Sequence, residues 1–263
     1  MRSSLLGVCV ALAAGCASTP DDPLVWSDLV VRTLERERSD VVEAAGFSRL
    51  QPGASPEPWE PWLIVRGNKP TRYDIARVDG VVALAAEGVE GGSGMWRKIR
   101  VDPRHNPLLE WRWRVPQPEP GSPPLTVTAR ASPLARLSVG FHGDVEKLDV
   151  EDRVKLRMAK ALTVNGLPYA SLLYVWMVNQ PVDTVIISPH TERVRMIVVE
   201  SGVQRAGQWI TIRRNVLEDF RRAFKEEPDD IVGVGLMTDY GDDGSRRRVF
   251  YGDITFRSEG AVK

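Results

Sequence analysis

The chain has 263 residues, of which 43% are hydrophobic and 27% charged, enough for one large domain with a substantial core. Its 35 basic residues balance 35 acidic residues, so no overall positive field favours nucleic acid. Nucleic-acid binding is therefore not expected.

Residues 1–15 have the pattern of a bacterial lipoprotein signal peptide. Arg2 precedes an apolar stretch over residues 5–14, which is too short to remain as a transmembrane anchor. Residues 13–16 resemble a lipobox, although Ala13 stands where leucine is usual, so we expect Cys16 to be acylated; the alternative is an ordinary signal cleaved nearby. Residues 16–25 would then form a tether, and Ala17 indicates an outer-membrane lipoprotein that faces the periplasm.

The next segment, residues 26–46, predicts an amphipathic helix. Apolar side chains recur among charged ones, and Gly46 follows as a C-terminal signal. Behind it, residues 51–61 are rich in proline and break regular structure, yet Trp59 and Trp62 should pack against the domain. We expect this domain to cover residues 47–257, with a short tail over residues 258–263.

Short apolar runs then follow at regular spacing, each bounded by glycine, proline, aspartate or asparagine. They cover residues 62–66, 72–78, 81–87, 95–101, 108–115, 135–142, 171–178, 184–188 and 194–200. This spacing is typical of an all-β domain and predicts a mostly β fold, a β-sandwich with an N-terminal helix and one or two short inserted helices. Residues 149–162 are the candidate for one inserted helix.

The C-terminal stretch, residues 208–256, has the clearest boundaries between predicted elements. Asn215 is followed three residues later by Glu218, which predicts a capping box and a short helix through Phe224. The apolar run over residues 231–237 contains Gly233 and Gly235, where we expect a neighbouring backbone or ligand to approach closely. An acidic turn and a final strand complete the pattern.

Several ordered blocks resemble one known family. They read WEPW, PTRYD, DGVVALAAEG, GSGMWRKIRVDP, LLEWRWRV, YVW, QWITIRRNVLEDFRRAF, GVGLMTD and YGDITF. Together they are similar to the domain-of-unknown-function family numbered 3047, over residues 47–256. The resemblance implies a bacterial secreted protein of jelly-roll, galactose-binding-like shape and carries no established activity. This chain lacks the family's acidic pair before the strand with Arg136 and Phe141, and a cation held there in relatives would be lost.

Two aromatic pairs are candidates for binding a glycan. Trp111 and Trp113 alternate with charged residues, so both rings lie on one side of a strand, and Tyr174 and Trp176 repeat the arrangement. Such rings can stack on sugars, with Arg136 and His142 as further ligand contacts; the alternative, favoured for each pair, is that the rings fill the core. Arg112 and Arg114 then face either a ligand or solvent.

Carboxylates supply the other candidate sites. Asp239, Asp242 and Asp243 could present oxygen ligands to calcium, but the spacing is not that of an EF-hand, and a hairpin turn explains them equally well. Asp219 and Asp253 could serve glycoside hydrolysis; the alternatives are an ion pair with Arg214 and a strand-end hydrogen-bond acceptor. No zinc motif, nucleotide-binding glycine loop or serine elbow is present, and no cofactor is expected.

The sequence thus predicts a lipid-anchored, periplasm-facing β-sandwich that binds a glycan or envelope polymer without catalysis. One alternative is an enzyme that acts on polysaccharide through Asp219, Asp239 or Asp253. Another is a structural partner in an envelope protein assembly, which would show an exposed apolar patch.

Overall fold

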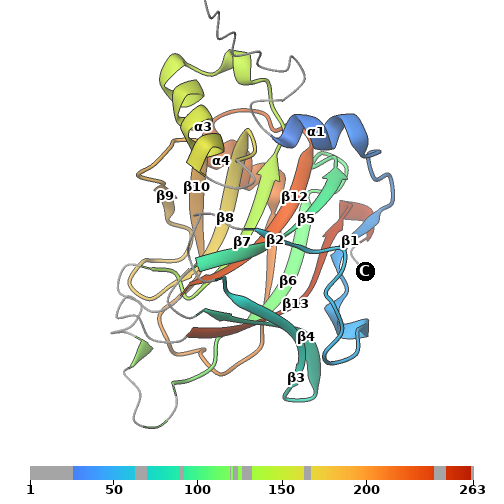
Figure 1. Ribbon diagram of the computed structural model, residues 1–263, viewed down its shortest axis with the longest axis vertical. Coiled ribbons are helices and arrows are strands. Elements are labelled where there is room, and N and C mark those ends of the chain that lie inside the picture. Colours follow the sequence, from blue (N-terminus) through green and yellow to red (C-terminus); the bar gives the residue numbers. More distant parts are fainter. Residues whose placement is uncertain are drawn as a thin grey trace, which may run out of the picture.

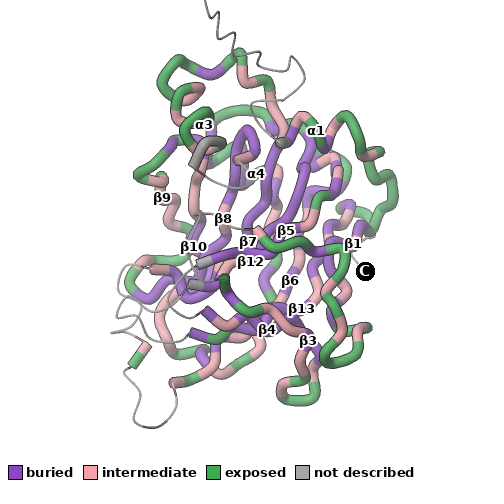
Figure 2. The backbone as a smooth tube through the Cα atoms, in the orientation of Figure 1, coloured by how far each residue is buried: buried purple, intermediate pink, exposed green. Residues whose placement is uncertain are grey.

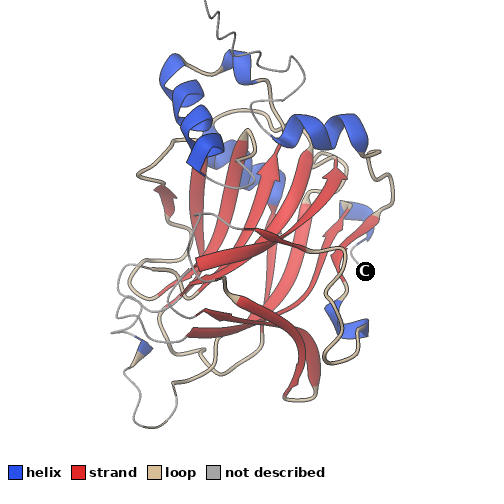
Figure 3. Ribbon diagram, in the orientation of Figure 1, coloured by secondary structure: helices blue, strands red, loops and turns tan. Residues whose placement is uncertain are grey.

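The computed structural model describes residues 26–62, 70–88, 92–118, 120, 124–125, 132–162, 167–239 and 247–261. Two β-sheets pack face to face, and helices gather at one end of them (Figures 1 and 3). The seven-stranded sheet, here sheet A, has the strand order β2-β5-β12-β7-β8-β10-β9. The six-stranded sheet, sheet B, has the order β11-β6-β13-β4-β3, with β1 paired to β13. The predicted mostly β sandwich is confirmed.

The strands lie close to the predicted ranges. Sheet A contains β2 (Glu60–Trp62), β5 (Gly92–Val101), β7 (Ala135–Phe141), β8 (Ala170–Met177), β9 (Val185–Ile187), β10 (Val194–Ser201) and β12 (Ile231–Asp239). Sheet B contains β1 (Val41–Ala45), β3 (Arg72–Val78), β4 (Val81–Gly88), β6 (Leu108–Arg114), β11 (Ile210–Asn215) and β13 (Arg247–Arg257). The chain changes sheet between β4 and β5, β5 and β6, and β6 and β7, which gives the sandwich its jelly-roll-like course.

Three α-helices accompany the sheets in the described part of the chain: α1 (Trp26–Thr33), α3 (Val150–Leu162) and α4 (Val216–Phe224). Short 3-10 turns occur at Phe47–Arg49, Val145–Lys147 and Glu259–Ala261. The predicted cap of α4 is present, because the Asn215 side chain accepts a hydrogen bond from the Glu218 backbone N–H at 3.1 Å. None of the described helices is long and apolar enough to cross a bilayer.

The predicted helix over residues 26–46 is wrong in its second half. The helix ends at Thr33, and residues 41–45 form β1 instead, antiparallel to β13. Val42, Ala44 and Ala45 are buried there in the hydrophobic core. Pairing with β13 and burial of these side chains outweigh the weak local preference for helix.

Buried residues concentrate in the strands, whereas the connections are mostly exposed (Figure 2). The main core lies between the inner faces of the two sheets. As predicted, Trp59 is buried and its ring centroid lies 5.5 Å from that of Phe47, while Trp62 contacts Trp96 at 5.1 Å. The proline-rich segment is therefore part of the domain.

On the outer face of sheet A, a tryptophan side chain packs directly against glycine residues. Trp96 of β5 lies across Gly140 of β7 and Gly233 and Gly235 of β12, where a Cβ atom on Gly235 would meet the indole at 2.5 Å. A close approach is thus present at Gly233 and Gly235, but the neighbour is the Trp96 side chain and not the backbone or ligand that the sequence predicted. Only glycine leaves room for a ring this close to the backbone.

Candidate functional site

The four aromatic residues predicted to bind a ligand lie in the core. Trp111, Trp113, Tyr174 and Trp176 are each at most 1% exposed, between the two sheets. Their rings pack on one another, with centroids 5.1 Å apart for Trp111 and Tyr174 and 6.4 Å for Trp113 and Trp176. The interpretation of these rings as sugar-stacking residues is wrong, and the core alternative is right, because no ring face is open to a ligand.

Aromatic rings do occur on the opposite side of the same strand. The outer face of sheet B holds Arg112, Arg114, Trp209, Arg248 and Phe250, here the arginine–aromatic face. The Arg112 guanidinium lies 5.3 Å from the Trp209 ring centroid. Those of Arg114 and Arg248 lie 5.9 and 5.0 Å from the centroid of Phe250. Stacking on a ring holds each guanidinium plane in a defined orientation.

Small residues form the floor of this face. Ala83 and Ala85 of β4 are buried against Phe250, and Trp209 packs against the same cluster. Phe250 pairs with Ala85 on one side and with Arg114 on the other. A Cβ atom on Gly252 would lie 2.5 Å from Arg112 Cγ, so the stem of Arg112 rests directly on the backbone of β13. The face is consequently a broad surface from which guanidinium groups project.

The charges of this face are only partly neutralised. Arg114 Nε lies 2.9 Å from Asp79 Oδ2 and donates to the Gly207 carbonyl at 3.1 Å. Arg112 and Arg248, in contrast, form no ion pair with any described residue. Two arginine forks are therefore oriented by aromatic rings and remain available to an anionic group.

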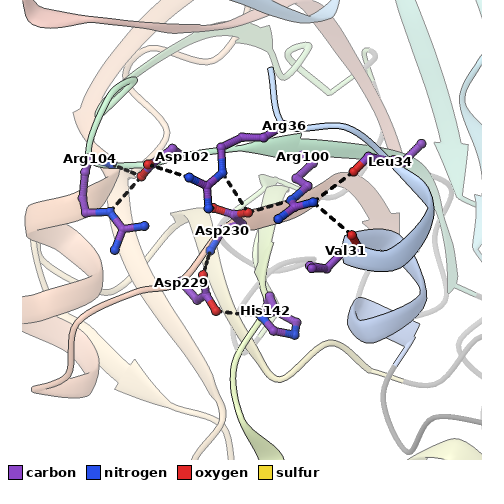
Figure 4. Close-up of polar contacts among 9 residues, drawn as sticks. All are labelled: Val31, Leu34, Arg36, Arg100, Asp102, Arg104, His142, Asp229 and Asp230. Atoms are coloured by element: carbon purple, nitrogen blue, oxygen red, sulfur yellow. Dashed lines mark hydrogen bonds and ion pairs between the residues drawn. The ribbon is translucent and has the colours of Figure 1, made fainter. Parts of the chain in front are cut away.

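A second polar region lies at the helical end of the sandwich, and we refer to it as the helical-end ion cluster (Figure 4). Asp230, at the start of β12, is buried between Arg100 and Arg36, with Arg100 Nε at 2.7 Å from Oδ2 and Arg36 Nη2 at 2.9 Å from Oδ1. Arg100 Nη1 also donates to the carbonyls of Val31 and Leu34, at 3.0 and 3.2 Å. These bonds satisfy carbonyls at the C-terminal end of α1 and fasten it to sheet A.

His142, predicted as a ligand contact, belongs to this cluster. Its Nδ1 lies 2.8 Å from Asp229 Oδ2 and its Nε2 lies 3.2 Å from Asp28 Oδ1 of α1. The hydrogen bond with Asp229, together with the nearby negative charges, raises the pKa of His142 above its usual value, against the opposing effect of burial. The same bond lowers the pKa of Asp229 to about 2. Both ring nitrogens have carboxylate partners, so His142 has a structural role and links Asp28 of α1 to Asp229.

An open cavity of about 1100 Å³ adjoins the cluster. Its lining is polar and of mixed sign, formed by Glu35, Arg36, Glu37, Arg38, Arg100, Asp102 and His105. Asp102 Oδ1 lies 2.9 Å from Arg104 Nε, and its Oδ2 lies 3.4 Å from Arg36 Nη1. The sequence analysis missed this region because its carboxylates and arginines are scattered from Asp28 to Asp230 and carry no local motif.

The candidate catalytic carboxylates Asp219 and Asp253 have structural partners. Asp219 is buried and accepts hydrogen bonds from Arg214 at 2.6 and 2.8 Å and from the Tyr174 hydroxyl at 3.1 Å. Asp253 accepts hydrogen bonds from the backbone N–H and the hydroxyl of Ser48, at 2.8 and 2.6 Å. The predicted ion pair of Asp219 with Arg214 and the acceptor role of Asp253 are both confirmed.

Arg136 is separate from both polar regions. It lies in β7 on the outer face of sheet A, where its Nη1 approaches Met237 Sδ at 3.3 Å. The predicted cation site falls largely outside the described residues: these include neither Asp242 nor Asp243, and Asp239 is placed only as the last residue of β12. Within the described ranges no group of three or more metal-ligating side chains occurs, and calcium at this turn stays a prediction.

A family model described as "Protein of unknown function (DUF3047)" matches residues 57–255, so the chain belongs to this family, as its sequence blocks predicted. No curated protein matches the sequence. Among solved structures, the chain is similar to the family 11 carbohydrate-binding module of the cellulase Lic26A-Cel5E of Clostridium thermocellum. The two share 9% identity and a TM-score of 0.41, over 84% of this chain and 96% of that one.

Two further structures show the same kind of likeness. One is a carbohydrate-binding module, CBM28, specific for non-crystalline cellulose, with 13% identity and a TM-score of 0.38 over 86% of this chain and 99% of that one. The other is a thermostable cellulase derived from Cel12A of Rhodothermus marinus, with 9% identity and a TM-score of 0.40 over 82% and 99%. Identities and scores this low transfer neither a ligand nor an activity.

Proposed function

We propose that this DUF3047 protein is a noncatalytic binding protein and that an acidic glycan or envelope polymer binds across the arginine–aromatic face. One observation supports the proposal above all others: Arg112 and Arg248 are oriented by aromatic rings and form no ion pair with any residue that the structure describes. A guanidinium fork matches the geometry of a carboxylate, sulfate or phosphate and binds it with two parallel hydrogen bonds.

The surroundings of the two arginines suit a polymer. Ala83, Ala85 and Gly252 form a floor without bulky side chains, and the partly buried ring of Trp209 offers apolar surface beside the guanidinium of Arg112. Sugars present apolar C–H faces together with hydroxyl and carboxylate groups, so one surface of this kind contacts both. Because the rings already fix the arginine side chains, binding loses little side-chain entropy.

The enzyme alternative has less support. Two of the three carboxylates that suggested hydrolysis, Asp219 and Asp253, accept hydrogen bonds from fixed donors. The side chain of the third, Asp239, lies outside the described part of the chain. A general acid or nucleophile needs a carboxylate that faces the substrate across a cleft. Noncatalytic binding at the arginine–aromatic face therefore remains the better proposal.

The first test is a calorimetric titration of the purified protein with polygalacturonate, using neutral dextran as the matched probe. We expect binding of the acidic polymer only, and Arg112→Gln or Arg248→Gln should each weaken it by about tenfold, because a hydrogen bond to a charged partner contributes roughly 1.5–3 kcal/mol. Arg221→Gln is the control, since Arg221 is an exposed arginine of α4 already paired with Glu227. Equal affinity for both polymers, or no effect of either variant, contradicts the proposal.

We further propose that the protein is a lipoprotein of the outer membrane, anchored through Cys16 and facing the periplasm. The support is the signal pattern of residues 1–15 and the alanine after the cysteine. Mass spectrometry of the native protein should find an acylated Cys16 as the new first residue. In cells, Cys16→Ser should abolish acylation and remove the protein from the outer-membrane fraction, and an unmodified N-terminus in the native protein contradicts the proposal.

A further inference from the structure

Helix α3 exposes an apolar stripe that no described part of the chain covers. Val150, Val154 and Met158 are 69%, 45% and 57% exposed. They are spaced four residues apart and so lie along one side of the helix. The other side carries Leu156, which is buried against the core. The helix therefore has apolar residues on its solvent side as well as on its core side.

This exposure is concentrated at one end of the molecule. Of the seven large apolar side chains that are exposed in the described part of the chain, four lie on α1 and α3: Leu29, Val150, Val154 and Met158. Both helices stand at the same end of the sandwich (Figure 1). The contact between His142 and Asp28 joins α1 to the segment that leads into α3.

Basic residues accompany the stripe. The acidic residues of α3, Glu151 and Asp152, are in its first turn, and every charged residue from Arg153 onward in this helix is basic. Arg153 and Lys155 are paired with Glu146 and Glu151. Arg157, in contrast, is exposed and forms no ion pair with the described residues. An apolar stripe flanked by lysine and arginine is the pattern of a helix that lies in a membrane interface, where anionic headgroups attract the basic side chains.

The course of the chain leads to the same end. Residues 1–25, which include the apolar stretch and Cys16, enter the domain through α1 at the helical end. Ten residues, from Cys16 to Val25, span at most about 35 Å when fully extended. Attachment of Cys16 to a bilayer would therefore hold the start of α1 within about 35 Å of that bilayer.

We infer that the helical end of the sandwich rests on an anionic lipid surface, with the side chains of Val150, Val154 and Met158 in the headgroup layer. This inference does not depend on glycan binding, but it rests in part on the proposed lipid anchor at Cys16. It fixes the orientation of the domain on the membrane, which a flexible tether alone would leave free.

Site-specific fluorescence tests the inference in the full chain. Cys9 and Cys16 are the only cysteines and are both replaced by serine, so that every variant has the same N-terminal segment. An environment-sensitive probe is then attached to Val154→Cys or Met158→Cys. The control is Val182→Cys, a valine of similar exposure, 49%, that lies outside α1 and α3, in the connection between β8 and β9. Vesicles contain phosphatidylglycerol and phosphatidylcholine with brominated acyl chains.

On addition of vesicles we expect a blue shift and quenching at positions 154 and 158, and no change at position 182. Arg157→Glu should lower the vesicle partition coefficient by roughly fivefold or more, since each basic residue near an anionic surface contributes appreciably to binding. Vesicle binding without quenching at 154 and 158, or no vesicle binding, overturns the inference. A blue shift that depends on protein concentration and not on vesicles also overturns it, in favour of contact between two copies.

Discussion

The outer faces of the two sheets both carry aromatic rings, but the rings have different neighbours. On sheet A, Trp96 lies flat on the glycines of β7 and β12 and is buried. On sheet B, Trp209 and Phe250 are accompanied by the guanidinium groups of Arg112, Arg114 and Arg248. Glycine lets a ring approach the backbone and closes the surface, whereas arginine places its charged guanidinium group over a ring at the surface. The first arrangement serves packing, and the second leaves hydrogen-bond donors for a ligand.

The largest difference between the faces should appear when each tryptophan is removed. Trp96→Ala should lower the free energy of unfolding by about 3–5 kcal/mol, because a buried indole leaves a cavity over the glycines. Trp209→Ala should cost clearly less, since Trp209 is only partly buried. Chemical denaturation of both variants measures the two values. Equal losses would show that the rings have the same structural role.

A single methyl group should have the next largest effect. Gly235→Ala places a Cβ atom against the Trp96 indole, and overpacking of this kind costs about 1–3 kcal/mol of unfolding free energy. Gly260→Ala is the control, because a Cβ atom there meets nothing within 4 Å. Combining Gly235→Ala with Trp96→Ala should cost less than the sum of the two single changes, as expected for groups in contact. Strict additivity would argue against the glycine–indole contact.

On sheet B the arginines should differ among themselves in ligand binding. Arg114 is already paired with Asp79, so Arg114→Gln should weaken binding of polygalacturonate by only about twofold, within the range of an exposed ion pair. Calorimetric titration of both variants, Arg114→Gln and Arg112→Gln, with polygalacturonate compares their affinities. A larger loss for Arg114→Gln than for Arg112→Gln would show that neutralisation by Asp79 does not govern the face.

The smallest expected effect is a difference between the pH dependence of the unfolding free energy and that of ligand affinity. The pKa of His142, at the end of β7, is raised above its unfolded value near 6.5, so its contribution to stability is fully present below pH 6.5 and is lost as the pH rises through the folded value. The lowered pKa of Asp229 acts oppositely: its contribution is present above pH 3.8 and is lost as the pH falls toward 2.

Unfolding free energy should therefore be highest between about pH 4 and 6.5, and His142→Gln should flatten its decline above that range. Polygalacturonate affinity should stay constant from about pH 5 to 8, because arginine does not titrate there. Denaturation curves and binding titrations across this range test the two statements. An affinity that follows the stability would mean that His142 affects the arginine–aromatic face.

The elements of this fold follow from local sequence to a large extent. Many of the strands begin or end near glycine, proline, aspartate or asparagine, and the cap at Asn215 fixes the start of α4. The second half of the predicted N-terminal helix is strand because β13 offers Val42 and Ala45 a pairing partner and a buried face. That partner lies about two hundred residues away in the sequence and leaves no local signal.

The site was harder to predict for a related reason. Alternation along β6 correctly separates Trp111 and Trp113 from Arg112 and Arg114, but a period of two does not say which side faces the core. Two rings accompany the arginines: Trp209 is the residue before β11, and Phe250 belongs to β13. Only the register between strands brings them to the same face.

The edge strands of sheet A limit contact between copies of the protein. Both edge strands, β2 and β9, are only three residues long, and Pro61 in the middle of β2 has no N–H to donate. Short or proline-containing edges give an incoming strand few partners and thereby resist edge-to-edge aggregation. Neighbouring copies should therefore not pair through sheet A, even at the density that the proposed membrane anchor would create.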